Sequence, residues 1–269
     1  PAGVLGNYNI AYNTANLTIN PKTASVTPNA ASKNFGSVDP VLTGTLSGFL
    51  PADNVTATYS RTAGETVAGS PYTISAILNP IGVLGNYTIT SNTANFTIIQ
   101  ASSTISLSNL NHVYDGTQKS ATATTNPLGL PVNITYNGSP TAPTDAGSYA
   151  VVATVNHPNY TGVTNNTLVV AKAVVIPIIT ASNKAYDGTT TATIATYNLT
   201  GTFFGDVVNL SGGTAAFANK NVGNNKTVIA VGLTLSGADA GNYQLSSTSA
   251  TTTANISRRV LTITATGVN

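Results

Sequence analysis

The chain has 269 residues, a formal net charge of +2 and only 7% charged side chains. Its ten Lys and Arg are too few and too scattered to form the basic face that nucleic acids or anionic membranes require, and no apolar stretch approaches the roughly 18–20 residues that cross a bilayer. The absence of cysteine excludes disulfides and thiolate metal sites, while abundant Thr, Val, Asn and Gly and a shortage of helix formers predict an all-β protein.

Residues 1–20 have the pattern of the last part of a repeated unit. Two strands are expected, one starting in Gly6-Asn7-Tyr8 and one at 15–19, with a short polar turn between them. Nearly the same residues recur in the same order about 80 positions later, at 85–89 and 94–98. We therefore interpret residues 1–20 as the C-terminal part of a truncated repeat.

Two short features recur along the chain with this period. The first is an Asn-Tyr pair, at residues 7–8, 86–87, 159–160 and 242–243. The second is an aromatic residue that leads into a glycine turn, which we call the aromatic turn: Phe35-Gly36, Tyr114-Asp115-Gly116 and Tyr186-Asp187-Gly188. Two independent features with one period of roughly 70–85 residues indicate tandem copies of one unit.

These features divide the chain into three complete units, at 21–99, 100–171 and 172–257, and the first strand of a further repeat at 258–269. Short strands separated by Gly, Pro, Asn and Asp are typical of β-sandwiches. We expect tandem Ig-like β-sandwich repeats that form an elongated, fairly stiff rod, because one or two residues join successive units. A β-grasp-like repeat is the alternative, and helix content distinguishes the two. Pro177 predicts an edge strand or a bend in the third unit.

The tyrosines of the Asn-Tyr pairs, Tyr8, Tyr87, Tyr160 and Tyr243, are expected to be core side chains. The chain has no Trp and few Phe, and a tyrosine whose hydroxyl bonds back to the backbone is typical of sandwich domains. An exposed aromatic platform that stacks on sugars is the alternative. In the aromatic turn we expect a buried ring, a glycine with positive φ, and an Asp that bonds the backbone two residues on.

No catalytic, cofactor-binding or metal site is expected. His112 and His157 are the only histidines, and neither has a second His or an acidic cluster nearby in the sequence. No nucleophile-elbow motif is present. The carboxylates are too isolated to supply the six to eight oxygens of a calcium site: Asp39, Asp53, Asp115, Asp145, Asp187, Asp206 and Asp239. A Lys–Asn isopeptide cross-link would need a buried geometry that the sequence does not show.

The order of these motifs resembles known bacterial repeat domains. Residues 173–257 resemble the YDG repeat of large bacterial surface proteins through the stretches 184–190, 220–223 and 235–243. Residues 21–99 and 101–171 are similar to MBG-type repeats, although the first has Asn34-Phe35-Gly36 where the second has Tyr-Asp-Gly. The resemblance implies a segment of a giant secreted adhesin or surface fibre, in families that carry no catalytic residues.

The function expected from this resemblance is a structural stalk that spaces a binding head from the bacterial cell. The protein is expected at the extracellular bacterial surface, with neighbouring repeats of the same chain as partners and no enzymatic activity, nucleic-acid partner or membrane insertion. Two alternatives are a carbohydrate- or protein-binding repeat module and a subunit of a self-assembling extracellular filament, in which like chains associate in a fibre.

Replacing Tyr87 by Ala tests whether the tyrosine of the Asn-Tyr pair is a core residue. Removing a buried aromatic ring typically costs about 3–5 kcal/mol, so one unit is expected to melt early while the others, each with its own core, hold. His157→Ala is the control, with little change expected because the sequence suggests no partner. A melting curve of Tyr87→Ala with every transition unmoved would place this ring at the surface and favour the sugar platform.

Overall fold

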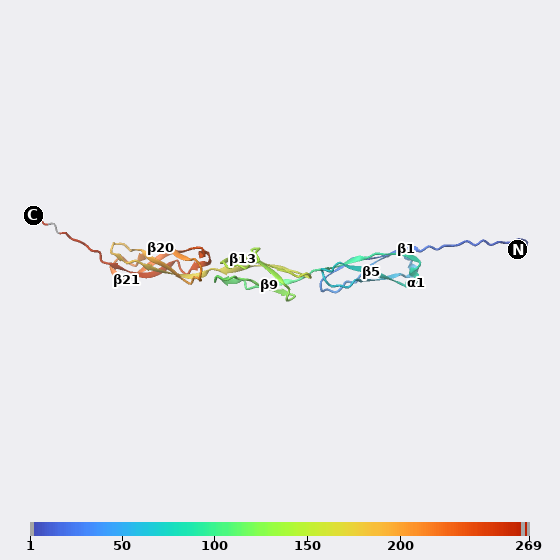
Figure 1. Cartoon of the computed structure of the whole chain (residues 1–269), viewed down its shortest axis with the longest axis horizontal. Helices are drawn as coiled ribbons and strands as arrows, with labels where there is room; N and C mark the ends of the chain where they lie inside the picture. Colours follow the sequence, from blue (N-terminus) through green and yellow to red (C-terminus); the bar gives the residue numbers. More distant parts are fainter. Residues whose placement is uncertain (1–2, 265–266, 268–269) are drawn as a thin grey trace. The chain divides into compact units, whose positions relative to one another are not determined.

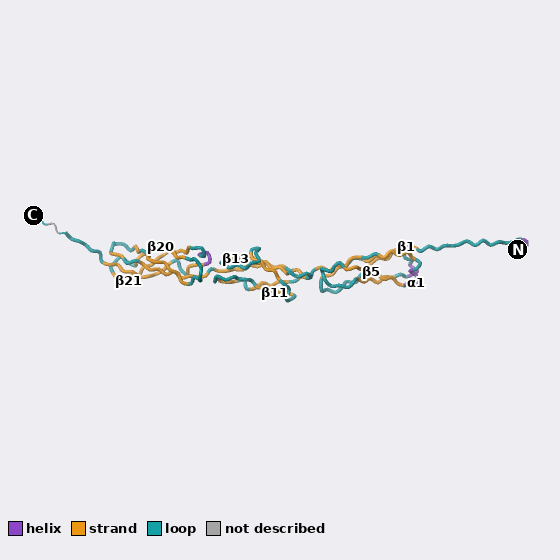
Figure 2. Tube along the Cα trace, in the orientation of Figure 1, coloured by secondary structure: helices purple, strands orange, loops and turns teal. Residues whose placement is uncertain are grey.

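The computed structural model describes residues 3–264 and residue 267. Of these, 52% are in β-strands and 5% in helices, and the one α-helix among them is the four-residue α1 (Ile81–Leu84). The remaining helices are single 3-10 turns, η1 (Leu5–Asn7), η2 (Pro51–Asp53) and η3 (Ala240–Asn242), and strands dominate the trace in Figure 2. No helix in the described part is long and apolar enough to cross a bilayer. This low helix content favours the sandwich over the β-grasp alternative.

The first set of strands, β1–β7, forms two sheets (Figure 1). In the three-stranded sheet, β1 lies between β3, which is antiparallel to it, and β6, which is parallel to it. The four-stranded sheet has the order β2-β7-β5-β4, with β2 and β7 parallel. The strands of this set are β1 (Lys22–Pro28), β2 (Ala31–Asn34), β3 (Gly44–Ser47), β4 (Thr56–Arg61), β5 (Tyr72–Asn79), β6 (Tyr87–Ser91) and β7 (Ala94–Ile99).

The second set, β8–β15, repeats this strand order. Its first strand is split into β8 and β9, which pair with β14 in parallel and with β11 in antiparallel fashion. Its other sheet has the order β10-β15-β13-β12. The strands are β8 (Ala101–Ser102), β9 (Thr104–Ser108), β10 (Asn111–Val113), β11 (Thr122–Asn126), β12 (Val132–Tyr136), β13 (Gly147–Val155), β14 (Tyr160–Thr161) and β15 (Val163–Ala171).

The third set, β16–β23, has the same arrangement a third time. One sheet has the order β19-β16-β22, and the other the order β17-β23-β21-β20-β18, in which β18 is an added edge strand. The strands are β16 (Ala173–Ala181), β17 (Lys184–Ala185), β18 (Thr191–Ala192), β19 (Ile194–Thr200), β20 (Asn209–Phe217), β21 (Gly223–Ser236), β22 (Tyr243–Leu245) and β23 (Ser249–Ser257). Three copies of one topology confirm tandem Ig-like β-sandwich domains.

The cores form because each inner strand alternates buried and exposed side chains, the period-two pattern of a sheet with one solvated face. In the third set, Ile179 of one sheet packs in a cluster with Phe217, Val228 and Ile256 of the other, so the two sheets face each other. In the first set, the core contains Ile74, Phe96 and Ile98, all 0–1% exposed, together with Tyr72.

The chain divides into two compact units, and each unit consists of two separate stretches of the sequence. The first contains the residues up to Ser102 and the short segment His157–Thr161. The second contains Ser103–Asn156 and the chain from Gly162 onwards. The Asn-Tyr pair at 159–160 therefore belongs to the unit that contains the first strand set, together with β8 and β14, whereas β9–β13 and β15 of the second set belong to the other unit.

Three segments that were expected to be strands are not strands. Residues 6–10 and 15–19 contain only the η1 turn, and their apolar side chains are exposed, for example Leu17 at 89%. Residues 258–263, expected to open a further repeat, are likewise outside any strand. The reason is physical: a strand needs partners, and β7, which matches 15–19 in sequence, is held between β2 and β5. The terminal segments have no such neighbours among the described residues.

The expectation for Pro177 is confirmed locally. β16 pairs with β22 through Ala173, Val174 and Val175, and with β19 from Ile176 onwards. At Pro177 the strand therefore has one partner, β19, and the side without a donor N–H faces no neighbouring strand. This placement lets proline occupy the middle of a long strand.

Candidate functional site

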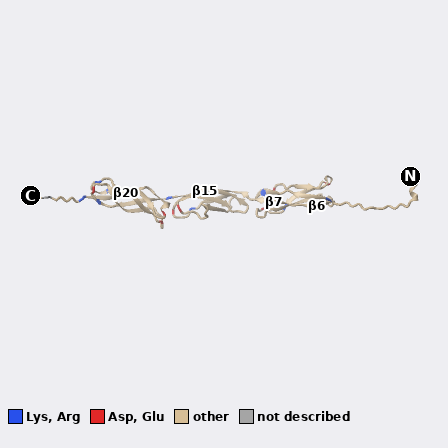
Figure 3. Ribbon diagram, turned by 90° about the horizontal axis from the view of Figure 1, so that it is seen from above, with Lys and Arg blue, Asp and Glu red and all other residues tan. Residues whose placement is uncertain are grey.

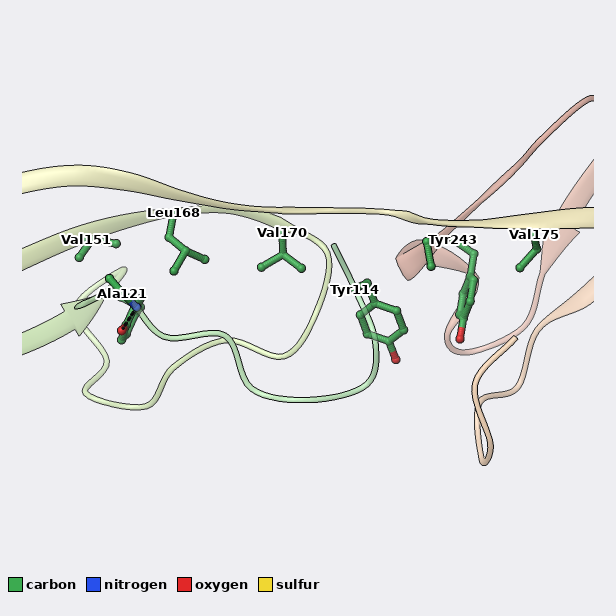
Figure 4. Close-up of a cluster of buried hydrophobic side chains, with 9 residues drawn as sticks. Tyr114, Ala121, Val151, Leu168, Val170, Val175 and Tyr243 are labelled. Carbon is green, nitrogen blue, oxygen red and sulfur yellow. Dashed lines mark hydrogen bonds between the residues drawn. The ribbon is translucent and has the colours of Figure 1, made fainter. Parts of the chain in front are cut away.

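The two recurring sequence features meet in space. In the first compact unit, the ring of Tyr160 lies 5.4 Å from the ring of Phe35, at an interplanar angle of 78°. In the second unit, the ring of Tyr243 lies 5.4 Å from that of Tyr114, at 73°, and Figure 4 shows these two side chains next to each other in the apolar cluster. Both pairs have the edge-to-face geometry that aromatic quadrupoles favour. We call each contact between an aromatic turn and the Asn-Tyr pair of the following strand set an aromatic joint.

The Asn of each pair makes the second contact of the joint. The backbone N–H of Val67 donates to Asn159 Oδ1 at 3.0 Å, and that of Ala146 donates to Asn242 Oδ1 at 2.8 Å. Both donors lie in the loop between the fourth and fifth strands of the preceding set. Asn242 is 7% exposed and also donates to Asp145 Oδ1 at 3.2 Å. An amide oxygen thus satisfies a loop N–H that would otherwise require water.

The tyrosine hydroxyl is anchored within its own strand set. The N–H of Leu50 donates to Tyr87 Oη at 3.0 Å, and that hydroxyl donates to Asp53. In the third set, the N–H of Phe203 donates to Tyr243 Oη at 3.0 Å, and the hydroxyl donates to Asp206 Oδ2 at 2.5 Å. The carboxylate lies three residues beyond the N–H donor in both sets. The tyrosine-corner expectation is therefore confirmed for these two residues, and the carboxylate adds a second anchor.

The second set lacks this anchor. The loop between β11 and β12 contains no carboxylate in residues 127–131, and Tyr160 is only half-buried. Its ring lies against Phe35 and, at 5.3 Å, against His157. Tyr160 is thus held mainly by contacts within the joint, whereas Tyr87 and Tyr243 also have an internal hydrogen-bonded support.

Asp206 connects the two sides of the second joint. Its Oδ2 accepts from Tyr243 of its own set and, at 2.9 Å, from the hydroxyl of Tyr114 in the preceding set. Burial together with this hydrogen bond raises the pKa of Tyr114 to about 12. Burial, followed by the bond to Asp206, also raises the pKa of Tyr243. Both effects stabilise the neutral phenols, which are the forms that donate to the carboxylate.

The aromatic turns are locked by a lysine and an Asx turn. The N–H of Thr117 donates to Asp115 Oδ1 at 2.9 Å, and that of Thr189 donates to Asp187 Oδ1 at the same distance. Gly116 and Gly188 have φ of 77° and 81°, as expected for turn glycines. Lys119 Nζ lies 2.5 Å from Asp115 Oδ2 and Lys184 Nζ 2.9 Å from Asp187 Oδ1. Hydrogen bonds from these lysines hold the pKa of both Asp side chains at about 2.

The first set replaces this lock with a larger cluster of charges, in a chain where charged side chains are sparse (Figure 3). Lys33 Nζ lies 2.7 Å from Asp39 Oδ1 and 2.5 Å from Glu65. Arg61 bonds both carboxylates and stacks 4.6 Å above the ring of Phe96. Arg61 and then Lys33 hold the pKa of Asp39 at about 2. Asp39 was expected to be isolated, and this is wrong: its partners Lys33 and Arg61 are separated from it along the chain but lie beside it in the structure.

The charge states in this cluster favour ion pairs rather than a covalent cross-link. Amide formation needs a neutral amine and a protonated carboxyl group, whereas here the pKa of Lys33 is raised and that of Asp39 is lowered. Among the described residues, no three His, Cys, Asp or Glu side chains form a group that could hold a metal ion. The cluster therefore consists of ion pairs, and Arg61 connects it to the core residue Phe96.

The two histidines make different contacts. His112 Nε2 is 2.9 Å from the carbonyl oxygen of Asn109. His157 is part of the first joint: its Nδ1 accepts from the N–H of Asn159 at 3.1 Å, and its ring contacts Tyr160. The expectation that His157 has no partner is therefore wrong. The sequence signal was its position two residues before the Asn-Tyr pair, and His157→Ala is expected to loosen this joint.

Two further expectations for the aromatic residues are corrected. Tyr8 is 67% exposed and Tyr186 is 37% exposed, whereas Tyr87, Tyr114 and Tyr243 are 8%, 4% and 2% exposed. Tyr8 has no strand set of its own among the described residues, and no ring from them packs on Tyr186. Burial of these tyrosines thus depends on a completed joint or an intact strand set. The three buried tyrosines do not form a platform for sugars.

The raised pKa of Tyr114 predicts a loss of stability at alkaline pH. A phenol has an ordinary pKa near 10, so the contribution of the Tyr114–Asp206 bond is fully present below pH 10 and is lost as the pH rises through about 12. In an absorbance titration at 295 nm, Tyr114→Phe is expected to remove one of the late-titrating tyrosines and to flatten the fall in melting temperature over this interval. The exposed Tyr12→Phe is the control that leaves the late step in place. An unchanged late step in Tyr114→Phe would contradict the assignment.

Comparison with solved structures gives similarities at low scores. The Sidekick-1 immunoglobulin domains 1–5 match with 10% identity and a TM-score of 0.33, covering 86% of this chain and 58% of that one. The three N-terminal domains of the bacteriophage RB49 Highly Immunogenic Outer Capsid protein match with 11% identity and a TM-score of 0.27, covering 89% of this chain and 100% of that one. The chain thus spans a little over half of the Sidekick-1 fragment. No curated protein sequence matches.

Comparison with protein-family models gives three matches in succession. An MBG domain of the YGX type matches residues 24–97, a second MBG domain matches 103–174, and a YDG domain matches 170–253. These ranges cover most of the three strand sets and contain both features that meet in the joints. The chain therefore belongs to the MBG and YDG families of repeat domains, with two MBG domains followed by one YDG domain.

Proposed function

We propose that this chain is a structural stalk segment of a large secreted bacterial surface adhesin or extracellular fibre, which spaces a binding head from the cell. Its role is mechanical rather than enzymatic, and its place is outside the cell. The observation that carries the proposal is the aromatic joint, which occurs twice with the same residue types and the same 5.4 Å ring separation. A recurring contact between an aromatic turn and the next Asn-Tyr pair, one in each compact unit, is a feature that a repeated spacer would be expected to have.

Two further features support a spacer. A single residue, Gln100, separates β7 from β8, and Lys172 alone separates β15 from β16, so the covalent connections have little freedom. Linkers of this length differ from the Gly- and Ser-rich linkers that let domains move independently. The ring contacts of each joint use residues at strand ends: Phe35 and Tyr114 directly follow β2 and β10, and Tyr160 and Tyr243 are the first residues of β14 and β22.

Small-angle X-ray scattering tests the spacer directly. A compact globule of this chain length would have a radius of gyration of about 18 Å. Three sandwiches in line, whose longest strands have 8, 9 and 14 residues at roughly 3.3 Å per residue, would extend over about 80–140 Å and give a much larger radius. A stalk is expected to keep this large radius when salt is raised, because its joints are mostly apolar. A radius close to the compact value would contradict the proposal.

A glycan array separates the stalk from the binding-module alternative. The aromatic platform that motivated the alternative is not available at Tyr87 or Tyr243, because both rings are buried. We expect no reproducible glycan binding by the full chain. Binding that is lost on replacing the exposed Tyr186, but not the exposed Tyr12, would instead favour a binding module.

A further inference from the structure

A single turn in the second strand set brings an asparagine side chain next to an unshielded backbone nitrogen. It contains the only Asn-Gly pair in the sequence, Asn137-Gly138, and begins directly after β12. The N–H groups of Tyr136 and Ser139 donate to each other's carbonyl oxygens at 2.7 and 2.9 Å and close the turn. Asn137 and Gly138 have φ of 49° and 85°, the positive values that a two-residue type I′ hairpin turn requires, and both residues are exposed.

The backbone nitrogen of Gly138 is accessible. Its N–H donates to no oxygen among the described residues, and a Cβ placed on Gly138 would meet no atom within 4 Å. Glycine also has no side chain of its own beside this nitrogen. Solvent hydroxide can therefore reach the N–H, and the space beside the residue is open.

The side-chain amide of Asn137 is polarised toward attack. The N–H of Ala150 donates to Asn137 Oδ1 at 2.8 Å, and the N–H of Asn137 donates to the carbonyl oxygen of Ala150 at 2.8 Å. A donor on the amide oxygen stabilises the negative charge that develops there when a nucleophile adds to Cγ. Asn137 Nδ2, the group that must leave, makes no hydrogen bond to the described residues.

We propose that Asn137 is a site of spontaneous covalent modification, at which the backbone nitrogen of Gly138 displaces the side-chain amide group. Hydroxide removes the proton from the Gly138 N–H, the nitrogen forms a bond to Asn137 Cγ, and the Cγ–Nδ2 bond breaks. Nδ2 takes up a proton from water and leaves as ammonia, which regenerates the hydroxide and leaves a five-membered succinimide. The reaction requires no partner and goes beyond the stalk proposal, because a stalk needs no covalent change.

Water opens the succinimide at either of its two carbonyl carbons. Addition at Cγ gives aspartate at position 137, and addition at the main-chain carbonyl carbon gives isoaspartate, in which the backbone continues through Cγ. The whole reaction consumes one water and releases one ammonia. Once the new carboxyl group ionises, the formal net charge of +2 falls by one unit.

The two products affect the second strand set differently. Aspartate keeps an oxygen that accepts from the N–H of Ala150, whereas isoaspartate adds one carbon to the backbone of a turn that two hydrogen bonds close. That turn follows Tyr136, which is 5% exposed and whose hydroxyl accepts from the N–H of Ala121 at 2.9 Å. Isoaspartate is therefore expected to loosen the end of β12 and to lower the melting temperature of the modified chains.

Three other asparagines share the backbone conformation of Asn137 but are followed by residues with side chains. They are exposed and have φ of 50°, 58° and 50°: Asn54, Asn109 and Asn225. In Asn54 and Asn109, Nδ2 also donates to a backbone carbonyl oxygen, at 3.2 and 3.0 Å. A Cβ beside the attacking nitrogen and a bonded leaving group both oppose the reaction, so these residues are controls within the same molecule.

The two Asp-Gly turns, at Asp115 and Asp187, are expected to be unreactive for another reason. Hydrogen bonds from lysines hold the pKa of both carboxyl groups at about 2. Both groups are therefore ionised near neutral pH, and a carboxylate repels an anionic nitrogen. The amide of Asn137 carries no charge and does not oppose the attack in this way.

Peptide mapping of the full chain by mass spectrometry tests the proposal. The chain would be incubated at mildly alkaline pH and digested, and loss of the side-chain amide would be measured in one sample at Asn137, Asn54, Asn109 and Asn225. Asn137 is expected to convert about tenfold faster than the other three, or more, at a rate that rises with pH and with release of ammonia. An amide at position 137 that persists, or that is lost no faster than the other three, would overturn the proposal.

Gly138→Asn is the matched variant. Asparagine tolerates positive φ, so the turn is expected to form, but the new Cβ lies beside the attacking nitrogen. Conversion at Asn137 is expected to fall about tenfold or more. After incubation the wild type is expected to melt earlier than before it, whereas the variant keeps its initial melting temperature. Conversion of the variant at the wild-type rate would contradict the attack by Gly138 and overturn the proposal.

Discussion

The edge-to-face contact between an aromatic turn and the following Asn-Tyr pair is the interaction that recurs in both compact units, and it joins residues about 125–130 positions apart in the sequence. The tyrosine stands at the start of the sixth strand in each set, and this strand is only two to five residues long. So short a strand has few ladder bonds of its own. Its position is fixed by the ring at one end and by the parallel pairing with the first strand, which runs directly on from the preceding set.

The three strand sets stabilise this tyrosine in different ways, which determines how strongly each tyrosine depends on the joint. Tyr87 and Tyr243 are bonded to a backbone N–H and a carboxylate of their own sets, so their positions are fixed whether or not a neighbour is present. Tyr160 lacks the carboxylate and belongs to the compact unit of the preceding set. In the second joint, Asp206 accepts from both tyrosines and links the two sets with charge-assisted hydrogen bonds, which are stronger than neutral ones.

Much of this organisation can be predicted from the sequence. The period, the all-β class and the turn chemistry follow from local residue patterns, because glycine with positive φ and the Asx bond depend on near neighbours. The joint was not predicted, since its partners lie about 80–130 residues apart, as Phe35 and Tyr160 do. The carboxylate anchors at Asp53 and Asp206 were missed for the same reason, although their equal spacing from Leu50 and Phe203 is a usable signal. The strands expected in the two terminal segments are absent, because a local residue pattern indicates strand propensity but does not provide the neighbouring strand with which it must pair.

A double-mutant cycle on Phe35 and Tyr160 tests the central claim most directly, because this joint has no shared carboxylate. Phe35→Leu, Tyr160→Leu and the double variant would be compared by urea unfolding of the full chain, with Phe35 and Tyr243, from separate joints, as the control pair. The account predicts a coupling free energy of about 0.5–1.5 kcal/mol for Phe35 and Tyr160 and additive effects for the control pair. Additive effects for Phe35 and Tyr160 would show that the two rings do not stabilise each other and would contradict the account.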